Sequence, residues 1–256
     1  MIHASAIVHP GARLGRNVSI GAYSLVGEHA EIGDDTWIGP HVVIEGHTRI
    51  GRGNRIFQFA SLGAVPQDKK YANEPTRLEI GDGNTIREFC TLNCGTAQDA
   101  GVTRLGNDNW VMAYVHIAHD CQIGDHTIFA NNAQLAGHVH VGDYAILGGF
   151  TGVHQFVRIG AHSFTAIATV LVHDLPPYVM AAGDSAKPYG INSEGLRRRG
   201  FSSAALAAIK RAYKTLYKSG LTLEQARVQL VEQAKTCAEI GVLADFLQNS
   251  TRGIVR

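Results

Sequence analysis

A branched aliphatic residue recurs at every sixth position over most of the chain, from Leu14 to Ile159, and glycine often follows it. The fifth position of each repeat is small, as at Ser24, Ala30 and Thr36. A six-residue period of this kind predicts a parallel β-helix, in which each hexapeptide supplies one short strand and one corner. Three hexapeptides make a triangular coil of about 18 residues, and successive coils stack about 4.8 Å apart.

Two polar segments break this register, "AVPQDKKYANEPTRLE" at 64–79 and "GTAQDAGVTR" at 95–104. Both are predicted to be loops that leave the β-helix and return to it. Long loops on a rigid scaffold often carry functional side chains. These two segments are therefore candidates for substrate contacts.

The six-residue period ends near residue 190, so the β-helix is predicted to span 1–190 and an α-helical domain to span 191–256. Ser202 is a candidate N-cap for "SAALAAIKRAYKTLYKSG", and Thr222 for "LEQARVQLVEQA". The helices are expected to cover the open end of the solenoid, where unpaired strand edges would otherwise invite aggregation.

Composition narrows the possible partners. Lys plus Arg number 23 and Asp plus Glu number 22, so no overall basic excess attracts nucleic acid or an anionic membrane. No signal sequence or run of about 18 apolar residues is apparent. The four cysteines do not match zinc spacings, and Cys90 and Cys121 fall on small inward positions. A cytoplasmic protein without stable membrane insertion is expected.

The segment "HIAHDCQIG", residues 116–124, suits a catalytic base with its carboxylate, a pair of metal ligands, or the polar rim of a repeat. Positions 18 apart should lie above one another, which places Gly137 and then Gln155 over His119. The same spacing places His138 over Asp120. An outward-facing cluster is therefore predicted, consisting of His116, His119, Asp120, His138, His154 and Gln155.

This cluster contains the parts that acyl transfer requires. His119 can act as a base, Asp120 can orient it, and the Gly137 N–H can meet an oxyanion. No serine or cysteine nucleophile lies in these columns, which favours direct attack by a substrate hydroxyl. A zinc site built from three histidines is the alternative. Asp120 and Gln155 fit hydrogen bonding better than zinc ligation, so no metal is predicted.

Several long segments also resemble one enzyme family. They include "YVHIAHDCQIG", "NNAQLAGHVHVGDYAILGG", "GVHQFVRIGAHS", "QDKKYANEPTRLEIG", "INSEGLRRRGFS" and "STRGIVR". In this order, and over essentially the whole chain, they resemble the bacterial UDP-N-acetylglucosamine O-acyltransferases, which begin lipid A biosynthesis. The resemblance implies a left-handed β-helix, an exception to the usual right-handed crossover. It also implies a cyclic homotrimer with active sites between subunits.

The resemblance further implies the reaction and its catalytic residues. A (3R)-3-hydroxyacyl chain would pass from the phosphopantetheine arm of acyl carrier protein to the 3-hydroxyl of UDP-N-acetylglucosamine. The protein would need no cofactor of its own. His119 would be the general base, Asp120 its orienting partner, and Gly137 the oxyanion donor.

Substrate contacts are implied in the same way. By itself each of these residues could also have no functional role, as Lys70 could be a solvated surface charge. On the outward cluster they are His116 and His138 at the sugar, and His154 and Gln155 in the nucleotide and acyl region. In the first loop they are Asp68 and Lys70, at the sugar nucleotide and pantetheine. At the start of the helical domain they are Asn192, Glu194 and Arg198, at uridine and phosphate. The "LRRRG" run could equally receive diphosphate or an acidic carrier protein.

Two departures from the family pattern stand out. Asn93 and Cys94 replace a His-Arg pair of some relatives, and their role is left open. Ile167 stands where long-chain members have glycine at the floor of the acyl groove. Because each excluded buried methylene is worth about 0.8 kcal/mol, Ile167 is expected to favour chains of roughly 10 to 12 carbons.

Three other functions remain open at this point. One is acylation of a 3-amino sugar nucleotide, since the same base could serve a nitrogen nucleophile. Another is a zinc-dependent hydratase of the β-helix type. The third is a β-helix scaffold without catalytic activity.

Overall fold

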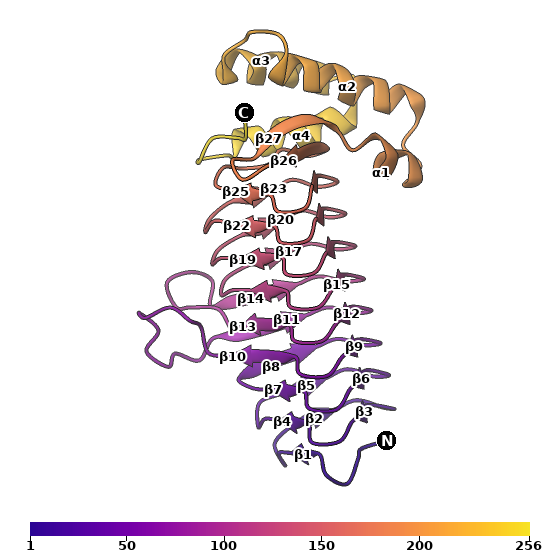
Figure 1. Ribbon diagram of the computed structural model, residues 1–256, viewed down its shortest axis with the longest axis vertical. Coiled ribbons are helices and arrows are strands. Elements are labelled where there is room, and N and C mark those ends of the chain that lie inside the picture. Colours follow the sequence, from indigo (N-terminus) through magenta and orange to yellow (C-terminus); the bar gives the residue numbers. More distant parts are fainter.

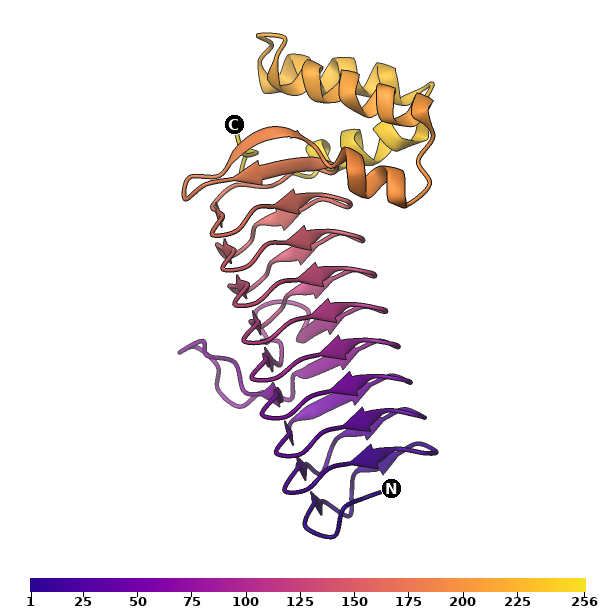
Figure 2. The ribbon, with the colours of Figure 1, turned by 45° about the vertical axis from the view of Figure 1, so that its right-hand side comes forward.

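The computed structural model describes all residues 1–256, and the hexapeptides form three sheets that run along a tall triangular prism (Figures 1 and 2). The first sheet contains β1 (Ile7–Val8), β4 (Leu25–Val26), β7 (Val43–Ile44), β10 (Ser61–Ala64), β13 (Thr91–Asn93), β16 (His116–Ile117), β19 (Gln134–Leu135), β22 (Gly152–Val153) and β25 (Val170–Leu171). The second sheet contains β2 (Arg13–Leu14), β5 (Glu31–Ile32), β8 (His47–Ile50), β11 (Arg77–Ile80), β14 (Val102–Leu105), β17 (Gln122–Ile123), β20 (His140–Val141) and β23 (Arg158–Ile159).

The third sheet closes the triangle. It contains β3 (Ser19–Ile20), β6 (Trp37–Ile38), β9 (Arg55–Ile56), β12 (Thr85–Ile86), β15 (Trp110–Val111), β18 (Ile128–Phe129), β21 (Ile146–Leu147), β24 (Phe164–Thr165), β26 (Val179–Ala182) and β27 (Lys187–Ile191). We call the turns from first to second, second to third and third to first sheet the first, second and third corners. The predicted repeat heads fill the interior, as at the buried Ile38, Ile86 and Ile117.

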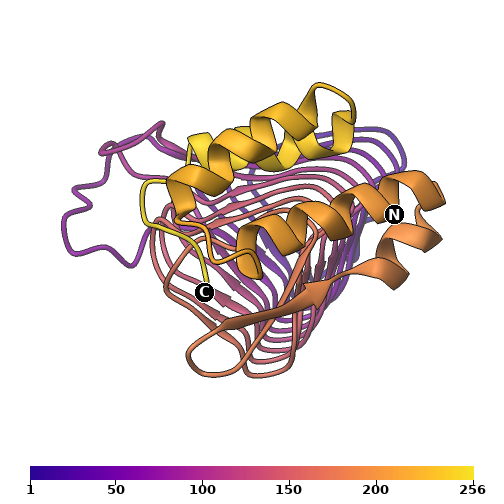
Figure 3. The same ribbon diagram turned by 90° about the horizontal axis from the view of Figure 1, so that it is seen from above.

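The α-helices form a layer over one end of the prism (Figure 3). They are α1 (Ser193–Arg198), α2 (Ser203–Tyr217), α3 (Leu223–Ala234) and α4 (Ala238–Gln248). The predicted caps are confirmed, because Ser202 accepts from the Ala205 N–H and Thr222 forms a capping box with Gln225. None of the four is both long enough and apolar enough to cross a membrane.

This layer has its own apolar cluster and docks on the last coil. The side chains of Leu196, Ile209 and Leu243 are buried together with Tyr178, whose hydroxyl donates to the Glu239 carbonyl at 3.0 Å. Below them, β27 pairs antiparallel with β26 and so ends the parallel stacking. Strand structure thus runs to Ile191, and the edge of the sheet is covered as expected.

Both loops are shorter at their C-terminal ends than predicted. They span 65–76 and 94–101, since Arg77 already lies in β11 and Val102 in β14. These two strands pair with each other, and Arg104 forms an ion pair with Glu79 at 2.8 Å. The charged outward residues of a paired strand resemble loop composition, which explains the difference. Both loops leave from the first corner.

A ladder of buried asparagines occupies the fifth repeat position where the pattern predicts only small residues. The Oδ1 of Asn54 accepts from the Asn84 N–H, and that of Asn84 accepts from the Asn109 N–H, each at 2.9 Å. Asn109 in turn accepts from the Thr127 N–H at 2.7 Å. Each amide therefore joins one coil to the next inside the core.

Replacing Asn84 with leucine is expected to lower the free energy of unfolding by about 2–4 kcal/mol, because buried groups of Asn54 and Asn109 lose their partners. Urea denaturation measures the change. Asn131→Leu, at an exposed position, is the matched control. A variant of Asn84 as stable as this control would show that the ladder contributes nothing.

Candidate active site

His119 lies at the first corner, two residues after β16 ends, and its ring stands against Gly137 of the next coil. A Cβ at Gly137 would lie 2.4 Å from Cε1 and 2.6 Å from Nε2 of His119. The stacking by 18 is confirmed nearby, where His116 pairs with Gln134. Only glycine allows the imidazole to approach this backbone so closely.

The Gly137 N–H donates to no acceptor within the protein. Its neighbours differ, since the Ala136 N–H donates to the Val153 carbonyl and the His138 N–H to the His119 carbonyl, each at 3.0 Å. A free backbone donor therefore lies directly beside the imidazole. Such a donor can stabilise a developing oxyanion.

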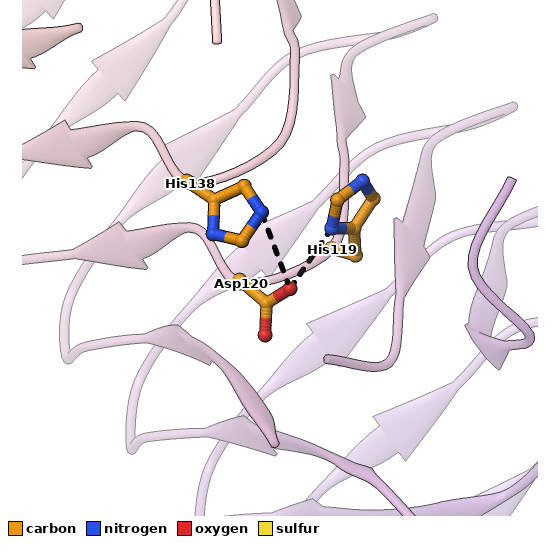
Figure 4. A group of neighbouring side chains, drawn as sticks. All are labelled: His119, Asp120 and His138. Carbon is orange, nitrogen blue, oxygen red and sulfur yellow. Dashed lines mark hydrogen bonds and ion pairs between the residues drawn. The ribbon is translucent and has the colours of Figure 1, made fainter. Parts of the chain in front are cut away.

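Asp120 holds the ring of His119 from the other side (Figure 4). Nδ1 of His119 lies 2.9 Å from Oδ2 of Asp120. Because a carboxylate only accepts, this contact assigns the proton to Nδ1 and leaves Nε2 free to accept one. The arrangement is that of a base with its orienting carboxylate.

The Asp120 side chain is fully buried, whereas the sequence predicted that it faces outward. The second loop covers it: Thr96 donates to Oδ1 through its N–H at 2.8 Å and to Oδ2 through its hydroxyl at 2.6 Å. Burial raises the pKa of Asp120, but the hydrogen bonds from His119 and Thr96 outweigh it and leave the pKa below its usual value. Asp120 is thus a charged, buried acceptor.

His138 completes the group. Its Nδ1 lies 2.8 Å from Oδ2 of Asp99 in the second loop, and its Nε2 lies 3.8 Å from Oδ2 of Asp120. The His138 ring stacks on the Phe156 ring with their centroids 4.4 Å apart, and it meets the His119 ring edge-on with a centroid distance of 5.1 Å. These contacts fix its orientation. Asp99 and Thr96 were not singled out from the sequence, although both belong to a segment predicted to carry function.

His116 is the first residue of β16, next to the first corner, and its side chain is mostly buried. Its Nδ1 and the Thr91 hydroxyl share a hydrogen bond of 2.7 Å. Burial lowers the pKa of His116, and the Thr91 contact opposes this only in part. A neutral imidazole at neutral pH follows.

His119, Asp120 and His138 also offer three ligand atoms within 4.8 Å of one another, a set that could hold a metal ion. In this structure Nδ1 of His119 already bonds to Asp120 and both Asp120 oxygens accept from Thr96, while His138 turns Nε2 toward Asp120 at 3.8 Å and binds Asp99 through Nδ1. This network suits proton transfer better than coordination. The absence of a metal stays a prediction, and metal analysis of the purified protein tests it.

Comparisons with known proteins point to one family. A family model described as UDP N-acetylglucosamine O-acyltransferase, domain 2, matches residues 174–255, and a model of bacterial transferase hexapeptides matches 29–56 and 103–137. The acyl-[acyl-carrier-protein]–UDP-N-acetylglucosamine O-acyltransferase of Thiobacillus denitrificans is 63% identical over 100% of this chain and 99% of its own. The chain belongs to the UDP-N-acetylglucosamine O-acyltransferases.

Solved structures of the family agree with the fold. The UDP-N-acetylglucosamine O-acyltransferase of Moraxella catarrhalis is 47% identical, covers 100% of this chain and 99% of its own, and has a TM-score of 0.97. The UDP-N-acetylglucosamine acyltransferase of Arabidopsis is 33% identical, with full coverage of both chains and a TM-score of 0.85. The predicted left-handed β-helix with C-terminal helices is thereby confirmed.

The remaining residues suggested by the family pattern fall into two groups. Near the first corner lie the exposed His154 and Gln155, one coil above Gly137. Asp68 and Lys70 belong to the loop 65–76, which leaves from that corner, and Oδ1 of Asp68 accepts from the Lys70 N–H at 3.0 Å. This short turn holds the two side chains together on the side of the molecule that carries His119.

The second group lies at the second corner. Asn192 is buried and caps α1, accepting from the Gly195 N–H at 3.1 Å and donating to the His162 carbonyl at 3.0 Å. Glu194 is exposed and forms an ion pair with Arg198 at 3.0 Å. This chain by itself therefore does not bring these residues to His119. Asn192, predicted as a substrate contact, has both ends of its side chain engaged within the protein.

Ile167 lies at the third corner and is 72% exposed. None of the five main surface pockets is lined by His119, Asp120 or Gly137. Ile167 and His119 lie at different corners of the prism. An acyl groove that runs between them would therefore need the surface of a second chain.

Asn93 and Cys94, whose role the sequence left open, are buried and support the first loop. The Asn93 side chain donates to the Val65 carbonyl at 3.3 Å, and the Cys94 thiol donates to the Gly63 carbonyl at 3.1 Å. Burial raises the pKa of Cys94 to about 11. An inert, structural thiol follows.

Proposed function

We propose that the enzyme transfers a (3R)-3-hydroxyacyl chain from acyl carrier protein to the 3-hydroxyl of UDP-N-acetylglucosamine, the first step of lipid A biosynthesis. The observation that supports this most directly is the free Gly137 N–H beside the His119 imidazole, with Nδ1 of that ring bound to the buried Asp120. Membership of the family supplies the two substrates.

His119 acts as the general base in this mechanism. Nε2 takes the proton of the sugar 3-hydroxyl while the oxygen attacks the thioester carbonyl of the donor. The carbonyl oxygen becomes an oxyanion, to which the Gly137 N–H donates. Collapse of the intermediate forms the ester and expels the thiolate of the phosphopantetheine arm, which receives the proton from the imidazolium. The donor brings the arm with it, so the protein needs no cofactor for this step.

Asp120 stabilises the imidazolium that forms during the reaction. Its carboxylate is held by Thr96 and excluded from water, so its interaction with the charged ring is stronger than at an exposed site. His138 is positioned by Asp99 and Phe156 to meet the sugar from the side. The neutral His116 offers a further hydrogen bond to the same substrate.

A second copy of the chain completes the site in this proposal. The uridine and phosphate contacts Glu194 and Arg198 lie at the second corner, and the acyl-groove residue Ile167 at the third. A cyclic homotrimer packs the corners of neighbouring prisms together and can place these residues against the first corner of the next chain. Asn192 then acts by holding α1 in position.

Competition between acceptors tests the choice of nucleophile. We expect the purified enzyme, given an acyl carrier protein donor and equal amounts of UDP-N-acetylglucosamine and its 3-amino analogue, to form mainly the 3-O-acyl product, identified by mass spectrometry. Predominant amide product would assign the enzyme to N-acylation instead.

Stoichiometric zinc, with loss of activity on chelation, would contradict the base mechanism.

Ile167→Gly is expected to shift the preferred donor to longer acyl chains, because removal of the branched side chain opens space for further methylenes, each worth about 0.8 kcal/mol. Relative kcat/KM values over a series of hydroxyacyl carrier proteins measure the shift. Val172→Gly, an exposed apolar position of the same coil, is the control. An unchanged optimum in the Ile167 variant would exclude a role in chain-length selection.

A further inference from the structure

The last residues of the chain are fixed against the top coil of the β-helix. Ser250 donates its hydroxyl to Oδ2 of Asp174 at 2.7 Å, and the Asp174 N–H donates to the Gly253 carbonyl at 3.0 Å. The Val255 N–H returns to the Asp174 carbonyl at 2.9 Å. Gly253 has a φ of +72°, which favours glycine at this turn. The C-terminal end accordingly lies above β25 in Figure 1.

Arg252 lies inside this anchored segment. Its carbonyl accepts from Nδ1 of His173 at 3.1 Å, and one guanidinium nitrogen, Nη2, lies 3.4 Å from Nδ1 of His154. The tail thereby holds the Arg252 side chain at the first corner, the corner that carries His119. No role in the mechanism above uses it.

The Arg252 guanidinium has donors to spare. It forms no ion pair with a carboxylate, and its terminal nitrogens make one contact, that of Nη2 with His154, whereas its Nε is buried. Many other arginines of the chain are paired with acids, as Arg104 is with Glu79. A fixed, unneutralised guanidinium is suited to bind a phosphate group through its planar set of donors.

The position of Arg252 along the prism decides between the substrate phosphates. Gly137, Gln155 and His173 follow His119 at intervals of one coil. Arg252 contacts His154 and His173, which lie two and three coils above His119. It therefore lies roughly 10–14 Å beyond the base along the axis. In UDP-N-acetylglucosamine only one sugar ring separates the reacting hydroxyl from the diphosphate, which places those phosphates nearer to His119.

The arm of the donor matches this separation. About thirteen bonds join its sulfur to its phosphorus, equivalent to roughly four residues of backbone, which reach about 14 Å when extended. We propose that Arg252 binds the phosphate of the donor's phosphopantetheine arm and so fixes the register of the thioester over Gly137. This inference rests on the proposed function and adds a residue to its donor site.

Two donors that differ only in the phosphate test the proposal, namely 3-hydroxyacyl-phosphopantetheine and 3-hydroxyacyl-pantetheine. The wild-type enzyme is expected to favour the phosphorylated donor by about 10-fold or more in kcat/KM, the size typical of a charge-assisted contact. Arg252→Gln should abolish this preference without raising the KM for UDP-N-acetylglucosamine. Arg252→Lys should keep part of it, and Arg256→Gln, on the same tail, should keep all of it.

The ratio between the two donors is internal to each protein, so partial unfolding of a variant does not mimic the result. Arg252→Gln and Arg252→Lys with the full wild-type preference would overturn the proposal. A raised KM for UDP-N-acetylglucosamine with an intact donor ratio would assign Arg252 to the acceptor and overturn it as well. If the wild-type enzyme transfers no acyl group from acyl carrier protein and none from either short donor, the proposed function is overturned, and this inference with it.

Discussion

His119→Ala is expected to lower kcat for acyl transfer by roughly 10²–10⁴-fold, the contribution typical of a general base. The reason is that Nε2 of His119 is the proton acceptor beside the free Gly137 N–H, and no neighbouring group can replace it. His138 is held by Asp99 and Asp120, and His116 by Thr91. Steady-state kinetics with saturating donor and acceptor measure the loss.

The control for this variant is His3→Ala. His3 is an exposed histidine near the N-terminus, and its replacement should leave the rate unchanged. Thermal denaturation should show that both variants remain folded, since Thr96 still donates two hydrogen bonds to Asp120 when the His119 ring is removed. A His119 variant with the wild-type rate would exclude this residue as the base and revive the scaffold or metal alternatives.

Gly137→Ala is expected to lower kcat by about 10²-fold. The added methyl group would lie 2.4–2.6 Å from the His119 ring, so the imidazole must turn away from the oxyanion donor. Displacement of a catalytic group by about 1 Å can cost a factor of this size. The backbone at Gly137 does not require the left-handed conformation, so the chain should fold normally.

Gly152→Ala is the matched control for Gly137→Ala. It lies in β22, which pairs with β19, the strand that precedes Gly137, and a Cβ there would meet nothing within 4 Å. Activity should be unchanged in this variant, and the melting temperatures of both proteins should stay close to that of the wild type. Full activity of Gly137→Ala would show that the close approach of His119 to this backbone has no catalytic importance.

The period of six predicted the parts of this protein that depend on stacking. Residues 18 apart do lie above one another, so Gly137 beside His119 and His138 beside Asp120 could be predicted without the structure. The caps Ser202 and Thr222 were predictable because their signals are local. Regular repeats convert sequence spacing into spatial distance, and local caps need no distance at all.

The features of the site that the sequence did not predict depend on segments outside the six-residue repeat. Thr96 and Asp99 contact Asp120 and His138 through the path of the second loop, which no period describes. That path also buries Asp120, which the repeat alone places on the surface. The bond from the Asn192 side chain to the His162 carbonyl likewise depends on where α1 docks on the β-helix, which no repeat describes.

The buried asparagine ladder was missed for a different reason. A single asparagine at an inward position looks unfavourable, because an unpartnered buried amide is costly. Asn54, Asn84 and Asn109 satisfy one another only when three coils are aligned. Their hydrogen bonds are a property of the stack, not of any one repeat.

The most direct test of the account is transfer by the purified protein from a series of (3R)-3-hydroxyacyl carrier proteins to UDP-N-acetylglucosamine, followed by mass spectrometry. We predict a single 3-O-acyl sugar nucleotide, formed fastest from donors of roughly 10 to 12 carbons and lost in the His119→Ala protein. Absence of any acylated sugar nucleotide, or its formation at the wild-type rate without His119, would contradict the account.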